Sequence, residues 1–183
     1  MLYPHLLMAS IVGMNIREIA DILGINYRTV QQRMAAMGVK THVFFVPARD
    51  QMKLVMAIDD CMRQWLQKQI QDVPIGSILP AESRKLDALL HEIANRLHEL
   101  DEAHKKASDP VLTESAIDAI QGIIKHGTLS AAAGGNNSRK ASMSVILRRA
   151  GIVSVRAALP DECAEKIRDL AATCLQELLD AGH

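Results

Sequence analysis

Aromatic residues are scarce in this sequence of 183 residues, where phenylalanine, tyrosine and tryptophan together make up 3%. Proline and glycine are also sparse, with 6 and 10 residues, whereas hydrophobic residues make up 49%. Strands favour aromatic and β-branched residues, and helices favour the alanine, leucine and methionine that are abundant here. We therefore expect an all-α protein.

Cysteine is sparse as well, and none of the three cysteines forms a C-x-x-C pair. This argues against both a zinc ribbon and a disulfide scaffold. Cys61, Cys163 and Cys174 are interpreted as small apolar residues in a reducing compartment. The apolar N-terminal segment lacks the basic flank of a signal peptide and is too short to span a bilayer. These features predict a cytoplasmic protein.

The motifs of common enzymes are missing. No serine lies in a G-x-S-x-G context, and no G-x-x-x-x-G-K-[ST] loop is present. His91-Glu92 does not begin an H-E-x-x-H site, because Asn95 occupies the position of the second histidine. His98 follows seven residues after His91, with no third ligand near it in the sequence. We expect no enzyme activity, no metal site and no cofactor.

The formal net charge is zero, but the charges are segregated along the chain. Residues 1–49 carry five Lys/Arg against two Asp/Glu, and residues 110–159 carry six against two. Residues 50–109 carry eight against eleven, and residues 160–183 carry two against six. A nucleic acid responds to the basic face presented to it, so a neutral total is compatible with binding.

The clearest pattern lies in residues 15–37, NIREIADILGINYRTVQQRMAAM. Asn15 and Glu18 have the spacing of a helix capping box, and Gly24 follows an apolar helical run as a C-terminal cap does. Asn26 then begins a second helix with Val30 on its inner face. Two helices joined by a short turn with a glycine at the corner resemble the helix-turn-helix superfamily of DNA-binding proteins. An ordinary helical hairpin is the alternative.

The resemblance implies double-stranded DNA as the partner, with the second helix in the major groove, as in phage and plasmid regulators. Gln31 or Gln32 can pair with adenine and Arg28 with guanine or a phosphate, whereas Thr29 and Arg33 suit backbone oxygens. The candidate DNA-binding residues of this unit are Asn26, Tyr27, Arg28, Thr29, Gln31, Gln32 and Arg33.

Residues 127–152 repeat this plan. We expect a short helix over residues 129–133, a polar turn, and a second helix that ends at Arg149. The corner, Gly134-Gly-Asn-Asn137, lacks the apolar residue of the first unit, so a loop that contacts phosphate and a plain helical pair are alternatives. The candidate DNA-binding residues of this unit are Arg139, Lys140, Ser142, Ser144 and Arg148.

The remaining segments predict helices over residues 4–12, 48–72, 81–106 and 114–125 and from Pro160 onward. Leu86, Leu90 and Ile93 begin a short heptad-like seam, which indicates either a hairpin within the chain or a dimerisation stem. Residues 42–46, HVFFV, favour a strand. A single strand needs a partner, and the sequence does not clearly supply one. A wing strand, a strand pair between subunits and an apolar connector are the alternatives.

These patterns divide the chain into a helix-turn-helix unit (residues 1–47), a helical hairpin with a possible role in oligomerisation (48–108), and a second helix-turn-helix-like unit with a C-terminal packing helix (109–183). We expect a sequence-specific transcriptional regulator that forms a homodimer or a larger homo-oligomer. An oligomeric DNA-recognition protein resembling a phage terminase small subunit is the alternative. A module that binds only proteins is the third possibility.

Overall fold

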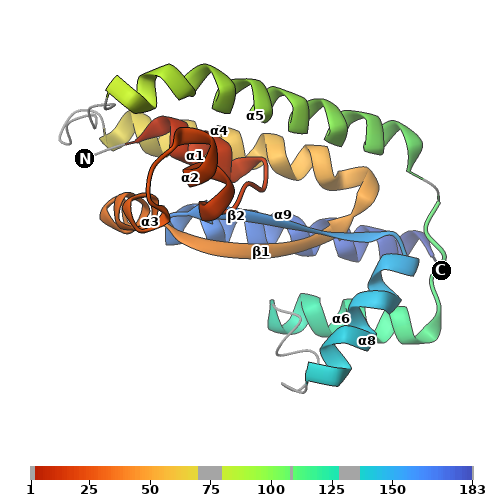
Figure 1. The fold of residues 1–183 in the computed structure, drawn as a ribbon. Coiled ribbons are helices and arrows are strands. Elements are labelled where there is room, and N and C mark those ends of the chain that lie inside the picture. Colours follow the sequence, from red (N-terminus) through yellow and green to blue (C-terminus); the bar gives the residue numbers. More distant parts are fainter. Residues whose placement is uncertain (1–2, 70–79, 108, 128–136, 183) are drawn as a thin grey trace. The chain divides into compact units, whose positions relative to one another are not determined.

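The computed structural model of the chain describes residues 3–69, 80–107, 109–127 and 137–182. For residues 80–81 and 137–142 it describes the backbone alone. The structure is mostly helical (Figure 1). No described helix is long and apolar enough to cross a membrane. The described elements, in chain order, are α1 (Pro4–Ile11), α2 (Ile16–Leu23), α3 (Tyr27–Ala36), β1 (Lys40–Pro47), the 3-10 turn η1 (Ala48–Asp50), α4 (Gln51–Gln69), α5 (Pro80–Lys106), α6 (Glu114–His126), α8 (Asn137–Arg149), β2 (Ile152–Leu159) and α9 (Asp161–Ala181).

Two strands correct the all-α expectation. β1 contains the apolar run of residues 42–46, and it pairs with β2 in a two-stranded antiparallel sheet. A hydrogen bond of 2.8 Å from the Ala48 N–H to the Gly151 carbonyl lies just beyond the strand ends. The run is therefore neither a connector nor a strand that depends on another subunit, because its partner lies more than a hundred residues along the same chain.

The chain divides into two compact units, each made of three segments. Unit 1 comprises Met1–His42, Val55–Leu100 and Arg156–Ala164. Unit 2 comprises Val43–Leu54, Asp101–Val155 and Glu165–His183. Both strands and the helices α4, α5 and α9 contribute residues to each unit.

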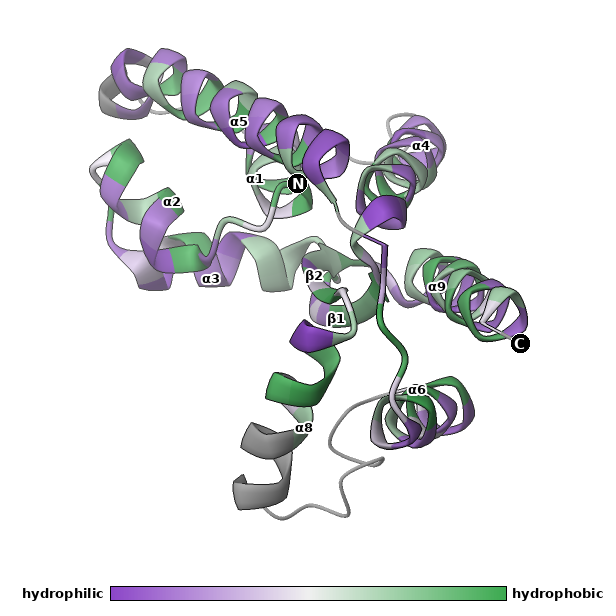
Figure 2. Ribbon diagram, turned by 90° about the vertical axis from the view of Figure 1, so that its right-hand side faces the viewer, coloured by the Kyte–Doolittle hydropathy of each residue, from purple (hydrophilic) through white to green (hydrophobic). Residues whose placement is uncertain are grey.

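The core of unit 1 is formed by apolar side chains of α1, α2, α3, α4 and α5. Burial of a leucine or isoleucine side chain contributes on the order of 2 kcal/mol. On α5 the buried apolar positions are Leu89 and Ile93, whereas Leu90, which the heptad spacing places on the inner face, is 40% exposed. Figure 2 shows the hydrophobic and hydrophilic positions alternating along α5, as in an amphipathic helix. Fully buried members of the core include Leu6, Leu7, Ile19, Val30, Ile58 and Leu89.

The core of unit 2 lies between α6, α8 and the C-terminal part of α9. Leu147 is buried, and Met143 and Ile146 pack against the same cluster, so these three side chains form the inner face of α8. The C-terminal part of α9 contributes an apolar stripe to the same core. The buried residues of the α6 and α9 faces are Ala116, Ala119, Ile120, Ile123, Leu175, Leu178 and Leu179.

The order helix, glycine, strand, proline, helix occurs twice in the chain. Gly38 corresponds to Gly151 and Pro47 to Pro160, with an offset of 113 residues in both cases. Both glycines have positive φ, 71° and 78°, where each helix gives way to its strand. The last residues of α3 and α8 are separated by the same offset. Buried core residues such as Met62 and Leu175 are also separated by it. The chain therefore contains an internal repeat, and α5 lies in the sequence between its halves.

Candidate nucleic-acid interface

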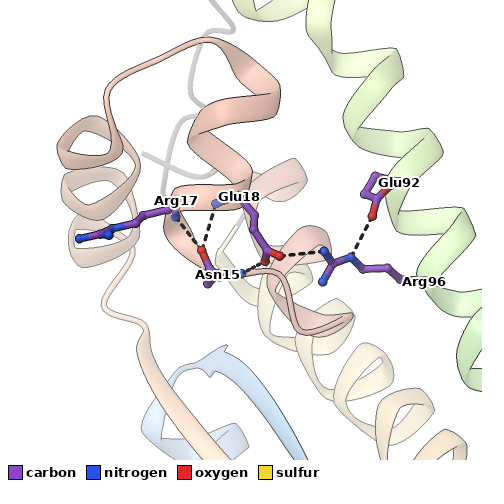
Figure 3. Close-up of polar contacts among 5 residues, drawn as sticks. All are labelled: Asn15, Arg17, Glu18, Glu92 and Arg96. Carbon is purple, nitrogen blue, oxygen red and sulfur yellow. Dashed lines mark hydrogen bonds and ion pairs between the residues drawn. The ribbon is translucent and has the colours of Figure 1, made fainter.

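The N-terminus of α2 carries the complete capping box that the sequence predicts. The side-chain oxygen of Asn15 accepts hydrogen bonds of 3.0 Å from the N–H groups of Arg17 and Glu18. The Glu18 carboxylate accepts one of 2.8 Å from the Asn15 N–H (Figure 3). Backbone donors that would otherwise be unsatisfied are thus bonded, and a cap of this kind contributes about 1 kcal/mol.

The corner between α2 and α3 consists of Gly24, Ile25 and Asn26. Gly24 adopts a left-handed conformation with φ 69°, and the Ile25 N–H donates to the Ala20 carbonyl at 3.1 Å. The Asn26 side chain then caps α3 by accepting a hydrogen bond of 2.9 Å from the Arg28 N–H. The predicted turn and both predicted caps are confirmed, and α2 packs directly against α3.

The exposed face of α3 is polar and carries no carboxylate. Arg28, Gln31 and Gln32 are exposed, and Tyr27 is 42% exposed. Thr29 is half-buried, and Asn26 is exposed but already bonded as the cap of α3. The opposite face is anchored by the buried Val30 and Met34. The predicted base-contacting side chains are therefore accessible, and the buried face holds the helix in place.

Arg33 lies elsewhere than the sequence suggested. Its guanidinium lies 2.8 Å from the carboxylate of Glu82 on α5, and the two side chains are 13% and 0% exposed. It also lies over the ring of Tyr3, 4.9 Å from the centroid. Arg33 directly precedes the buried Met34, so the helix places it at the edge of the packed face. Because this side chain packs α3 against α5, we leave it out of the proposed DNA contacts.

His5 lies on α1 beside this ion pair. Burial lowers the pKa of its imidazole, the Glu82 carboxylate opposes that effect, and the Arg33 guanidinium adds to it. Among the described residues, none forms a hydrogen bond with His5 Nε2. Burial inside unit 1 thus favours the neutral form of this imidazole.

A hollow of about 540 Å³ lies beside α3 in unit 1. Two arginines line it, Arg17 at the start of α2 and Arg156 on β2, and both residues are exposed. Among the described residues that line the hollow, none carries a carboxylate. Its polar lining also includes Ser10, Asn15, Tyr27, Gln31 and Thr41.

Arg17 and Arg156 were missed by the sequence reasoning. Arg17 extends away from the Glu18–Arg96 contacts in Figure 3, and its guanidinium lies 5.7 Å from the Tyr27 ring centroid. Such a contact keeps the cation beside α3. The sequence signal that could have found Arg156 is its place between the apolar Val155 and Ala157, because side chains alternate between the two faces of a strand. Both neighbours are buried on β2.

Arg96 on α5 holds the N-terminus of α2 in place. Its guanidinium donates to Glu18 at 3.0 Å and to Glu92 at 3.1 Å (Figure 3). The hydrogen bond from the Asn15 N–H lowers the pKa of the Glu18 carboxyl, burial opposes this, and Arg96 adds to the lowering. The same carboxylate thus closes the capping box and binds α5, which fixes the orientation of α2 within unit 1.

In unit 2, α8 packs against α6 and carries the second group of predicted residues. Ser144 and Arg148 are exposed, and the repeat offset matches them to Gln31 and Ala35 on the exposed face of α3. The side chains of Arg139, Lys140 and Ser142 lie outside the described part, although the residues belong to α8. The expected helix over residues 129–133 and the Gly-rich corner from residue 134 to 136 also lie outside it.

Within the described ranges, no three His, Cys, Asp or Glu side chains are grouped so as to hold a metal ion. Comparison of the chain with family models, curated proteins and solved structures found no match.

Proposed function

We propose that this chain is a sequence-specific double-stranded DNA-binding protein that acts as a transcriptional regulator, with α2 and α3 as a helix-turn-helix and α3 as its recognition helix. The observation that carries the proposal is the exposed face of α3, which is polar and free of carboxylates. The two N-terminal caps and the left-handed glycine hold this face on a defined corner. A short corner between two packed helices is the arrangement that places a helix in the major groove.

We propose separate roles for the exposed residues. Gln31 and Gln32 suit the paired donor and acceptor of adenine, and Arg28 suits guanine or a phosphate. Arg17 and Arg156 offer positive charge beside α3 without an acidic neighbour in the hollow, which suits phosphate oxygens. Base contacts of this kind discriminate by about 1–3 kcal/mol each, whereas the phosphate contacts fix the register of the protein on the duplex.

The internal repeat supports α8 as a second helix that reads the DNA sequence. Ser144 and Arg148 lie at positions that correspond to the exposed face of α3. With Arg139, Lys140 and Ser142 on the same helix, α8 belongs to the basic segment of residues 110–159. Two readers in one chain require a long or bipartite DNA site.

Equilibrium binding to specific and unrelated duplexes over a series of salt concentrations tests this proposal. Binding is expected to weaken steeply with salt, because bound counterions are released from the phosphates. The double change Arg28→Ala with Gln31→Ala is expected to abolish the preference among sequences while residual affinity remains.

Arg63→Ala with Gln64→Ala is the matched control, because both side chains are exposed on α4 in the same unit. The control should keep the sequence preference of the wild type. An unchanged preference in the Arg28 and Gln31 variant would exclude α3 as the reader.

A further inference from the structure

Two thiols from distant parts of the sequence meet inside unit 1. Cys61 lies in α4 and Cys163 in the first turn of α9, 102 residues further along the chain. The Cys61 thiol donates to the sulfur of Cys163, with the two Sγ atoms 3.0 Å apart. The Cys163 thiol in turn donates to the Cys61 carbonyl at 3.5 Å. Both cysteines are in the thiol form.

This geometry is close to that of a disulfide. A disulfide bond is about 2.05 Å long, so the sulfurs need to approach by about 1 Å. The reciprocal contacts show that both side chains already point toward each other. Cys61 is partly exposed and Cys163 is 2% exposed, so a small oxidant reaches the pair from the Cys61 side.

We infer that Cys61 and Cys163 are an oxidation site that forms a reversible intrachain disulfide with peroxides. The Cys61 thiolate attacks one oxygen of hydrogen peroxide, the O–O bond breaks, and the hydroxide that leaves takes up the thiol proton to form water. The Cys163 sulfur then attacks the Cys61 sulfenic acid, the S–O bond breaks, and a second water leaves with the Cys163 proton. The two thiols together lose two electrons and two protons, and the peroxide is reduced to two water molecules. A dithiol reductant reverses the bond by exchange.

The bond would tie the middle of α4 to the start of α9. Asp161, two residues before Cys163, lies 3.7 Å from Lys40 at the start of β1, so the linked segment borders the beginning of the sheet. A ring of this length strongly restricts the unfolded chain. We expect oxidation to raise the melting temperature by about 5–15 °C.

The third cysteine provides an internal comparison. Cys174 stands 113 residues after Cys61, at the equivalent position of the repeat, whereas the equivalent of Cys163 is Asp50. Cys174 is buried, and burial raises the pKa of its thiol. The pair that the repeat makes equivalent to Cys61 and Cys163 is therefore Cys174 and Asp50, which cannot form a disulfide, and Cys174 should stay reduced under conditions that oxidise Cys61 and Cys163.

The test uses the full chain, reduced and then titrated with hydrogen peroxide, followed by alkylation of the remaining thiols and peptide mass mapping. One alkylated cysteine, Cys174, and a linked peptide pair containing Cys61 and Cys163 are expected, together with the higher melting temperature. Dithiothreitol should restore three alkylated thiols.

Cys61→Ser is the deciding variant, because Cys61 is the less buried partner and the change keeps a side chain of similar size. It should abolish the crosslink and the rise in melting temperature, and Cys174→Ser should retain both. A linkage through Cys174, a linkage between chains, or three alkylated thiols after oxidation would overturn the inference.

Discussion

The guanidinium of Arg33 on α3 lies 2.8 Å from the fully buried carboxylate of Glu82 on α5. Burying both charges is costly, and the cost is offset only while each group keeps its partner. An arginine that stands among the predicted DNA-binding residues thus has a different task. It holds the proposed recognition helix against α5 within unit 1.

Removing one partner of this pair should destabilise the protein strongly. Glu82→Gln is expected to cost about 3–5 kcal/mol, because a buried guanidinium is left without its counter-charge. The double change Arg33→Met with Glu82→Leu should cost less than the sum of the single changes, as measured by urea unfolding. Breaking the exposed pair Arg63–Asp59 on α4 is the control, which should leave the free energy of unfolding almost unchanged because solvent screens exposed charges. Additive costs for Arg33 and Glu82 would show that they are not coupled.

Substitution of the corner glycine, Gly24, should destabilise the protein through backbone strain rather than through a steric clash. An added Cβ at Gly24 would meet no atom within 4 Å, but φ is 69°, where side chains other than glycine are strained. Gly24→Ala is expected to lower the free energy of unfolding by about 1 kcal/mol, and Gly24→Asn by less, because asparagine tolerates this region better. Equal losses for the two variants in urea unfolding would contradict this assignment.

Arg156 should act on DNA affinity without acting on sequence preference. Arg156→Ala is expected to reduce the slope of log affinity against log salt by about one, since one phosphate contact is lost. The ranking of duplex sequences should stay the same. Arg63→Ala removes an exposed arginine of α4 and should leave the slope unchanged. A slope in Arg156→Ala equal to that of the wild type would remove this residue from the interface.

Burial of His5 makes stability depend on pH. The folded state lowers the pKa of His5, so the unfolded chain, with an ordinary value of 6.5, takes up the proton first. His5 therefore does not reduce the free energy of unfolding above pH 6.5, but it lowers that free energy progressively as the pH falls below 6.5. His5→Leu should flatten the dependence of the free energy of unfolding between pH 7 and roughly pH 5. The same dependence in wild type and variant would place its origin in other groups.

The helices were predictable because their signals are local. Asn15, Asn26 and Thr113 lie directly before the helices that they cap, and Gly24 lies directly after the helix that it ends. Each such residue bonds a backbone group a few positions away, so its spacing in the sequence is sufficient.

The features that escaped prediction depend on distant partners. The residues around Phe44 favour a strand in the sequence, so β1 was predictable. β2 was not, because it contains Ala157 and Ala158, which have low strand propensity, and because its pairing with β1 spans more than a hundred residues. The position of Arg33 depends on Glu82, which lies on another helix. The place of Arg156 beside α3 follows from the sheet in the same way.

Selection of bound duplexes from a random-sequence library tests the central proposal most directly, because it reports binding, sequence preference and site length together. With the wild-type chain, we predict enrichment of one long or bipartite sequence, and the part that depends on Arg28 and Gln31 should disappear from the selection with the double alanine variant. Recovery of no duplex at low salt, or of duplexes without any shared sequence, would contradict the proposed function.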